Sequence, residues 1–217
     1  MNIEQARFNM IEQQIRPWDV LDPDVLELLH VVKRENFVPV AHKALAFVDA
    51  EIPLPGGESM LMPKIEARLL QDVNLKKHES VLEIGTGSGY MAALLAHKGR
   101  HVTTVEISPA LKALAEKNLA DNGVTNVKVE LGNGAQGWPS GAPYDVIVVS
   151  GSLPVLPEGL LQQLKVGGRL AVIVGPGPAM KAQLITRTGE AGYDTRTLFE
   201  TNVKPLASAT SPSTFQF

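Results

Sequence analysis

Three glycines at alternate positions, Gly85, Gly87 and Gly89, follow a short apolar run that contains an acid, Glu83. Glycine at such positions lets backbone amides come close to a ligand, because no side chain stands in the way. A dinucleotide-binding loop carries a further glycine or alanine at the sixth position of its pattern, where this chain has the bulky Tyr90. The spacing therefore predicts a ligand site of a different kind.

The acids near this loop indicate which ligand it binds. A carboxylate at Glu83 would repel a pyrophosphate and suit a cationic ligand. A second acid, Glu106, ends another strand-like run seventeen residues after Gly89, close to the spacing at which an acid binds a ribose diol. Both features favour S-adenosylmethionine, which has no phosphate and carries an ammonium and a sulfonium group. The simpler alternative is an ordinary α/β unit in which both acids are solvated.

The elements that position these residues alternate between strands and helices. Apolar runs predict five strands, at 80–84, 101–106, 126–131, 144–150 and 168–174. Helices are expected at 88–97, 109–122 and 157–164, and a tight turn at Gly167 and Gly168. Two further runs, 183–188 and 195–203, are too close for a helical crossover and predict an antiparallel pair at the sheet edge. We expect an α/β fold with a doubly wound, mostly parallel, seven-stranded sheet.

The first part of the chain has a different pattern. Asn2 and Asp22 can each cap a helix, and Pro23 suits the first helical position. The predicted elements are helices at 2–16, from 23 onward and at 64–73, a short element around 41–45, and a loop with fixed turns at 50–63. We expect a single domain, 1–217, in which a helical cap and substrate loop (1–63) precede a cofactor-binding sheet (64–217).

Composition narrows the possible functions. The 217 residues carry a net charge of −3, so we expect no nucleic-acid partner, since broad electrostatic binding needs a basic face. Without cysteine there are no disulfides and no thiolate ligands, and the five histidines lie too scattered to predict a metal site. No run of about 18 apolar residues predicts a membrane span. A cytoplasmic protein is expected, and nothing in the sequence indicates its oligomeric state.

The glycine loop and several other segments resemble a known family. Glu-Ile-Gly-Thr-Gly-Ser-Gly-Tyr at 83–90 is similar to the cofactor motif of class I S-adenosylmethionine-dependent methyltransferases and, more narrowly, of protein-L-isoaspartate O-methyltransferases. Further segments follow that family's order, at 10–17, 34–39, 49–55, 132–134, 137–138, 144–149 and 203–206. The resemblance implies the sheet described above, a helical N-terminal extension, and methylation of a carboxylate on altered aspartyl residues of other proteins.

The resemblance also implies which residues meet the cofactor and the substrate. Asn133, held between two glycines where the family usually has an Asp, is expected near the adenine. Asp49 and Ser59 are the candidate catalytic, substrate-facing groups. The predicted cofactor-binding residues are Glu83, Ile84, Gly85, Thr86, Gly87, Ser88, Gly89, Tyr90, Glu106, Ile107, Gly132, Asn133 and Gly134. The expected partner is a protein or peptide substrate, with no membrane involved.

The substrate loop departs from the family pattern. Residues 53–63 are two residues shorter than the usual loop, and Leu61 stands where the family has a serine. Ser59 replaces a threonine, and Glu58 replaces a glutamine. Methyl transfer to a carboxylate needs no general base, because the nucleophile is already ionised near pH 7, and catalysis then depends on alignment. If the shorter loop shifts its register, the hydroxyl group of Ser59 could hold the substrate carboxylate in this alignment.

Two alternatives follow from this loop. The protein could keep the cofactor and methylate another acceptor, a small molecule, another protein group or RNA, and Glu58 would then suit a cationic or amine-bearing acceptor. It could also be a cofactor-binding module that acts by interaction, without turnover. Methyl ester formation on an isoaspartyl peptide distinguishes the first interpretation from both alternatives.

Overall fold

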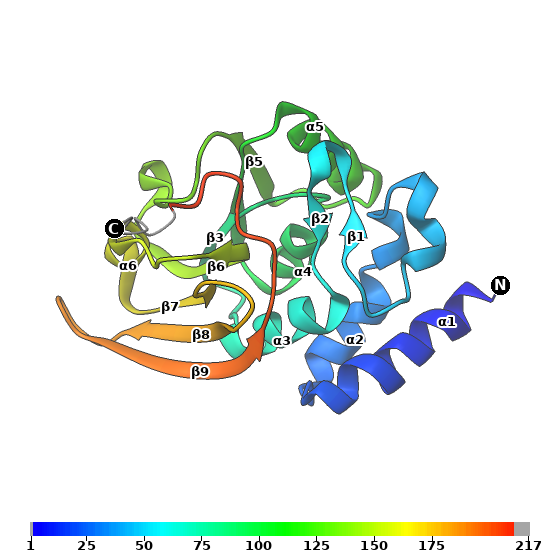
Figure 1. Cartoon of the computed structure of the whole chain (residues 1–217), viewed down its shortest axis with the longest axis horizontal. Helices are drawn as coiled ribbons and strands as arrows, with labels where there is room; N and C mark the ends of the chain where they lie inside the picture. The colour runs from blue at the N-terminus through cyan, green and yellow to red at the C-terminus, as the bar shows by residue number, and fades with distance from the viewer. Residues whose placement is uncertain (1, 211–217) are drawn as a thin grey trace, which may run out of the picture.

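The computed structural model describes residues 2–210 and centres on a seven-stranded sheet. Its strands are β3 (Ser80–Ile84), β4 (His101–Glu106), β5 (Val127–Leu131), β6 (Tyr144–Leu153), β7 (Leu164–Val174), β8 (Met180–Arg187) and β9 (Tyr193–Thr201). They lie in the order β5-β4-β3-β6-β7-β8-β9 (Figure 1). β3 to β7 are parallel, whereas β8 pairs antiparallel with both β7 and β9. The predicted mostly parallel α/β sheet with antiparallel pairing at its edge is confirmed.

The apolar runs explain why the inner strands are buried on both faces. Residues 146–149 of β6 and 170–173 of β7 are all fully buried, as expected for strands covered on both sides. β7 begins earlier than predicted, because Gly167 and Gly168 lie inside it, at a register shift against β6, and not in a turn before it. Gly167 has a φ of 83°, which residues with a side chain rarely adopt, so glycine permits this bulge.

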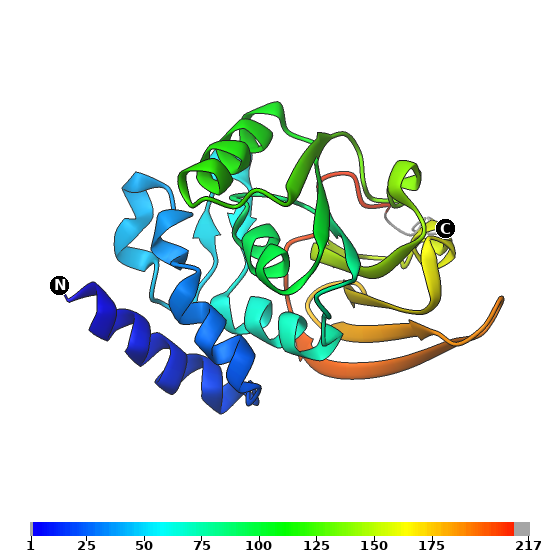
Figure 2. The same ribbon diagram turned by 180° about the vertical axis from the view of Figure 1, so that it is seen from behind.

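Helices and irregular chain cover the two faces of the sheet unequally. α3 (Pro63–Val73), α4 (Tyr90–Lys98) and α5 (Pro109–Asp121) lie on one side of the sheet (Figure 2). They contribute to one apolar core, which includes Val81 and Val102 of the sheet. The core on the other face includes Leu82, Ile84 and Leu160 of the short α6 (Glu158–Gln162). Neighbouring residues of β3 therefore point to opposite faces, as the period of a strand requires.

The N-terminal part packs into the same core as α3 and α4. α1 (Ile3–Met10) continues as a π-helical turn (Ile11–Ile15) and a 3₁₀ turn (Arg16–Trp18), and α2 (Pro23–Val31) follows. The predicted caps are confirmed, because the side chains of Asn2 and Asp22 accept hydrogen bonds from backbone N–H groups of the first turns. The division of one domain at residue 63 stays a prediction, and residues 1 and 211–217 lie outside the described part.

The segment 50–63, predicted as a loop with fixed turns, contains a small hairpin. β1 (Ile52–Pro53) and β2 (Ser59–Met60) pair antiparallel across a 3₁₀ turn (Pro55–Gly57). Gly56 and Gly57 have φ angles of 77° and 78°, so the turn depends on glycine at both positions. Two short 3₁₀ helices precede the hairpin, at Arg34–Asn36 and Val40–Leu45, and the second is the element predicted near 41–45.

The strand order opens a crevice at the carboxyl ends of β3, β4 and β6. From β3 the chain moves outward through β4 and β5, and it then crosses back to β6 on the other side of β3. At such a reversal the connections leave the sheet in opposite directions, and open α/β sheets bind ligands in the crevice between them. The site of the predicted ligand loop is therefore at this crevice. Within residues 2–210, no helix is both long and apolar enough to cross a bilayer.

Arg169 of β7 ties the end of α3 to the sheet. Its guanidinium donates to the backbone oxygens of Val73 (2.6 Å) and Asn74 (3.1 Å) and to the carboxylate of Glu79 (2.9 Å). In an Arg169→Met variant the aliphatic stem is kept, but these acceptors lose their donors. We expect the free energy of unfolding, measured with urea, to fall by about 1–3 kcal/mol.

The control for the Arg169→Met variant is Lys128→Ala on β5. Lys128 is 66% exposed and pairs with Glu130 on the surface, so its removal should change stability by less than about 0.5 kcal/mol. Equal stabilities of the two variants would mean that Arg169 does not stabilise the fold.

Candidate active site

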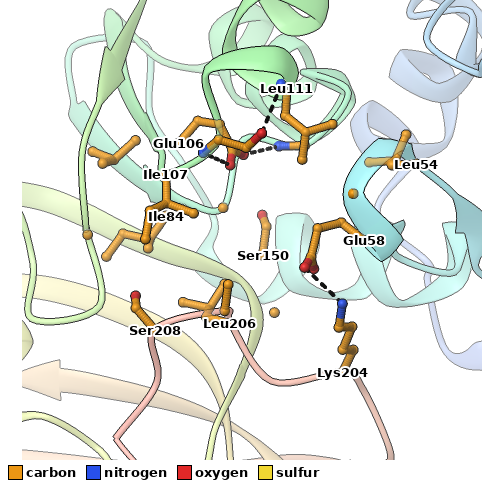
Figure 3. A pocket seen from close by; sticks show the side chains of 18 of the residues that line it. Leu54, Glu58, Ile84, Glu106, Ile107, Leu111, Ser150, Lys204, Leu206 and Ser208 are labelled. Carbon is orange, nitrogen blue, oxygen red and sulfur yellow. Dashed lines mark hydrogen bonds and ion pairs between the residues drawn. The ribbon is translucent and has the colours of Figure 1, made fainter.

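A cavity of about 190 Å³ lies at the crevice, between the hairpin and the segment 203–208 (Figure 3). The sheet side contributes the ends of β3, β4 and β6 and the turn after β5, and the opposite side comes from segments far away in the sequence. The residues that line the cavity include Leu54, Glu58, Ser59, Leu61, Ile84, Gly85, Gly87, Glu106, Ile107, Ser108, Gly132, Gly134, Ser150, Lys204, Leu206 and Ser208.

Glu106 forms the polar end of the cavity beside α5. One carboxylate oxygen accepts a hydrogen bond from the backbone N–H of Gly87, and the other from that of Ser108, both at 2.9 Å. Ser108 also caps α5, since its hydroxyl oxygen accepts from the N–H of Leu111 (Figure 3). Glu106 is only 5% exposed, and each of its oxygens keeps a lone pair for a further donor, such as a ribose hydroxyl.

The glycines bring the backbone against the cavity wall. Gly85 and Gly87 have φ angles of 90° and 53° and line the cavity. A Cβ atom on Gly85 would lie 3.0 Å from Leu206 and 3.2 Å from the carbonyl oxygen of Ser150, so a side chain there would displace the wall. Gly89 serves packing instead, because its Cβ position faces α5 at Ala115 and Leu119.

Glu83 lies beneath the cavity and is completely buried. Its carboxylate accepts hydrogen bonds from the hydroxyl groups of Thr104 (2.8 Å) and Ser150 (2.7 Å). Burial raises the pKa of Glu83 to about 8, although these two hydrogen bonds oppose the change. Glu83 faces a second, smaller cavity that shares Ser59, Leu61, Gly85, Gly87 and Ser150 with the main one.

A second buried acid faces the small cavity. Glu66 of α3 is 4% exposed, and burial raises its pKa to about 7, against the opposing charge of Arg34 at 3.6 Å. Arg34 is itself fully buried and donates to the backbone oxygen of Leu61 at 2.7 Å. Tyr90 packs against Arg34 and Phe37, and burial raises the pKa of its hydroxyl group. We did not predict either residue: Arg34 lies in the family-like segment 34–39 but was given no role there, and Glu66 belongs to no motif with recognisable spacing.

The hairpin places one of the two predicted catalytic groups, Ser59, at the cavity. The Ser59 hydroxyl lines the cavity but donates to Glu51 at 2.9 Å. Leu61 presents an apolar wall and is 6% exposed. Asp49 lines neither cavity, and its carboxylate pairs with Lys64 at 2.7 Å.

The predicted cofactor-binding residues separate into three groups. Seven line the main cavity, namely Ile84, Gly85, Gly87, Glu106, Ile107, Gly132 and Gly134. Glu83, Thr86, Ser88 and Tyr90 line only the small cavity. Gly89 and Asn133 line neither, and the Asn133 side chain accepts from the backbone N–H of Ala135 (3.0 Å) and from Ser208 (2.6 Å). Ligand contact by any of these residues stays a prediction.

The segment 203–208 was missed as part of the site. The only signal in the sequence was that the family resemblance continued to residue 206. Its backbone is fixed to β6, because the N–H of Ser152 donates to the oxygen of Lys204 (3.1 Å) and the N–H of Leu206 donates to the oxygen of Ser152 (3.0 Å). Among the described residues no group of three or more His, Asp or Glu side chains is arranged to hold a metal ion.

Comparison with known proteins identifies the family to which this chain belongs. Residues 5–211 match the family model for protein-L-isoaspartate(D-aspartate) O-methyltransferase. A protein-L-isoaspartate O-methyltransferase of Rhodopseudomonas palustris (strain ATCC BAA-98 / CGA009) is 41% identical over 92% of this chain and 92% of its own. The protein-L-isoaspartate O-methyltransferase of Methanoculleus marisnigri is also 41% identical, over 85% of this chain and 84% of its own.

Solved structures agree with this assignment. A protein-L-isoaspartate O-methyltransferase is 27% identical, with a TM-score of 0.79 over 94% of this chain and 67% of its own. A Plasmodium falciparum protein described as a beta-aspartate methyltransferase, in complex with S-adenosyl-L-homocysteine, shares the fold at 20% identity, with a TM-score of 0.80 over 95% of this chain and 98% of its own. The motif order, the sheet and these matches agree, and the chain belongs to the protein-L-isoaspartate(D-aspartate) O-methyltransferase family.

Proposed function

We propose that the protein transfers a methyl group from S-adenosylmethionine to the carboxylate of isoaspartyl residues in proteins or peptides. The observation that carries this proposal is a cavity at the strand-order reversal, with Glu106 at one end and Glu83 beneath the glycine loop, in a chain of this family. A cytoplasmic location and a protein or peptide substrate are parts of the same proposal.

The residues present fit this cofactor. Glu106 keeps free acceptor positions for a diol, and the glycine loop leaves room for close approach of a ligand. Lys204, the cation among the described lining residues, comes from the segment after β9 and pairs with Glu58, so the glycine loop itself brings no cationic side chain, which suits a ligand without phosphate. We infer that Glu83 ionises when a positive charge is brought next to it, because an opposite charge favours the carboxylate form. When bound, the cofactor supplies a methyl group on a positively charged sulfur.

The residues of this chain have to align the acceptor and exclude water. The acceptor carboxylate is ionised near pH 7, so no residue has to remove a proton from it. Rate enhancement then comes from holding the reacting atoms in contact along one line. Leu61 and Leu54 supply apolar walls that keep water out of the cavity. Ser59, held by Glu51, stays a candidate for contact with the substrate.

A labelled-cofactor assay tests the function directly. We expect methyl transfer to a peptide with one isoaspartyl residue, but not to the same peptide with normal aspartate. The product should be an ester, which mild base hydrolyses to methanol. Base-stable label on some other acceptor would favour the alternative of a different acceptor. Affinity for the cofactor product without any transfer would favour a non-catalytic binding module.

The role of Glu106 is tested by Glu106→Gln. The amide nitrogen cannot accept from the N–H of Gly87 or Ser108, so the loop loses one hydrogen bond and the diol loses an acceptor. We expect the affinity for S-adenosylhomocysteine, measured by calorimetry, to fall about 10- to 100-fold. Glu116→Gln on the exposed side of α5 is the matched control, and equal affinities of the two variants would exclude Glu106 from the binding site.

The buried acids predict an unusual dependence of stability on pH. In the folded protein Glu83 and Glu66 keep their protons up to about pH 8 and about pH 7, whereas the ordinary value is 4.5. Between pH 4.5 and the raised pKa of each acid, the folded state binds more protons than the unfolded state. The free energy of unfolding therefore decreases as pH rises through this range. Glu83→Gln removes one such group and should reduce this slope by up to about 1.4 kcal/mol per pH unit.

Urea unfolding of the cofactor-free protein between pH 5 and 8 measures this slope. The exposed Glu27→Gln is the control for the substitution itself. A Glu83→Gln variant with the same pH slope as the wild type would contradict a protonated, buried Glu83.

A further inference from the structure

An ion pair spans the main cavity at the end opposite Glu106. The ammonium group of Lys204 lies 2.8 Å from a carboxylate oxygen of Glu58, and it also donates to the backbone oxygen of Gly57 at 2.7 Å (Figure 3). Glu58 comes from the hairpin, whereas Lys204 comes from the segment after β9. The pair therefore joins the two parts of the chain that cover the cavity.

Lys204 is the cation among the cavity-lining residues of the described chain, and the acids there are Glu58 and Glu106. Glu106 lies at the other end, where two backbone amides hold it. Ser150, which donates to Glu83, lies between the two ends (Figure 3). A ligand bound at Glu106 would thus extend toward Ser150. An acceptor would approach from the end of the cavity where Lys204 lies.

Three of the four serines that line the cavity already donate their hydroxyl protons, and the fourth, Ser108, lies beside Glu106 at the other end. Ser59 donates to Glu51, Ser150 donates to Glu83, and Ser208 donates to Asn133. Leu61, which has no donor, stands where a serine was expected from the family pattern. An acceptor carboxylate brought into the cavity would therefore need a different donor, and an ammonium group provides a charge-assisted one.

We propose that Lys204 is the specificity-determining residue that binds the acceptor carboxylate, with Glu58 as its counter-ion in the substrate-free protein. This inference rests on the proposed function. The incoming carboxylate takes the place of Glu58 at the ammonium group, and Glu58 turns toward water. The methyl-accepting oxygen is thereby positioned without any proton transfer.

The arrangement suits such an exchange. The side chains of Lys204 and Glu58 are 44% and 32% exposed, and ion pairs of this kind contribute little to stability, so the pair opens readily. The backbone around Lys204 is fixed through Ser152 of β6, whose side-chain hydroxyl also donates to the oxygen of Val203 at 2.6 Å. The ammonium group thus reaches the cavity from a rigid base, which limits the entropy that is lost when a ligand binds.

Calorimetry with two peptides tests the proposal in the presence of S-adenosylhomocysteine. One peptide carries an isoaspartyl residue, and the other carries its amide analogue, which lacks the negative charge. We expect Lys204→Gln to weaken binding of the isoaspartyl peptide about 10- to 100-fold. Lys204→Arg should keep part of the affinity, and Glu58→Gln should increase it, because the competing carboxylate is removed. Binding of the amide analogue should not respond to these changes.

The controls separate this inference from the function on which it rests. Lys77→Gln, an exposed lysine at the opposite end of β3, should bind both peptides like the wild type. Thermal unfolding and affinity for S-adenosylhomocysteine report whether each variant is folded. Unchanged isoaspartyl binding by Lys204→Gln, with the wild type active, overturns the role of Lys204 alone. A wild type that binds the cofactor product but neither binds nor methylates the isoaspartyl peptide overturns the proposed function as well.

Discussion

The two hydrogen bonds from backbone amides to Glu106 are the constraint on which the site depends. They join the glycine loop after β3 to the start of α5, and so they fix two neighbouring connections at the carboxyl edge of the sheet. Glu106 can hold this position because it is buried and because its negative charge lies at the amino terminus of α5, where the helix dipole stabilises anions. The same carboxylate thus has a structural role before any ligand arrives.

Much of the fold and the centre of the site could be predicted from the sequence, because they depend on local pattern. β3, its glycine loop and α4 are contiguous, and Glu106 ends the next strand at a characteristic spacing. Asp49 could not be placed in this way, since its neighbour Lys64 comes from a helix that the hairpin separates from it. Asn133 likewise is engaged with Ser208, 75 residues later. Contacts between distant segments leave no periodic signal in the sequence. In this protein such contacts form the outer wall of the cavity.

The buried acids show a balance between stability and function. Glu83 and Glu66 lie in an apolar core, where the charged form of a carboxylate is costly. Hydroxyl donors at Glu83 and the guanidinium of Arg34 beside Glu66 reduce this cost without abolishing it. Departures from ordinary burial rules of this kind concentrate at functional sites, and here both acids face one small cavity beside the glycine loop.

β9 is an edge strand, and its side chains and shape affect whether two molecules of this protein can pair through their sheets. Its outer backbone groups have no neighbouring strand in the described sheet, and such a border would otherwise recruit strands from other chains. Asp194, Arg196 and Glu200 give β9 charges of both signs, and an irregularity opposite residues 182–183 increases its local twist. Charge and curvature together disfavour intermolecular β-pairing along this edge of the sheet.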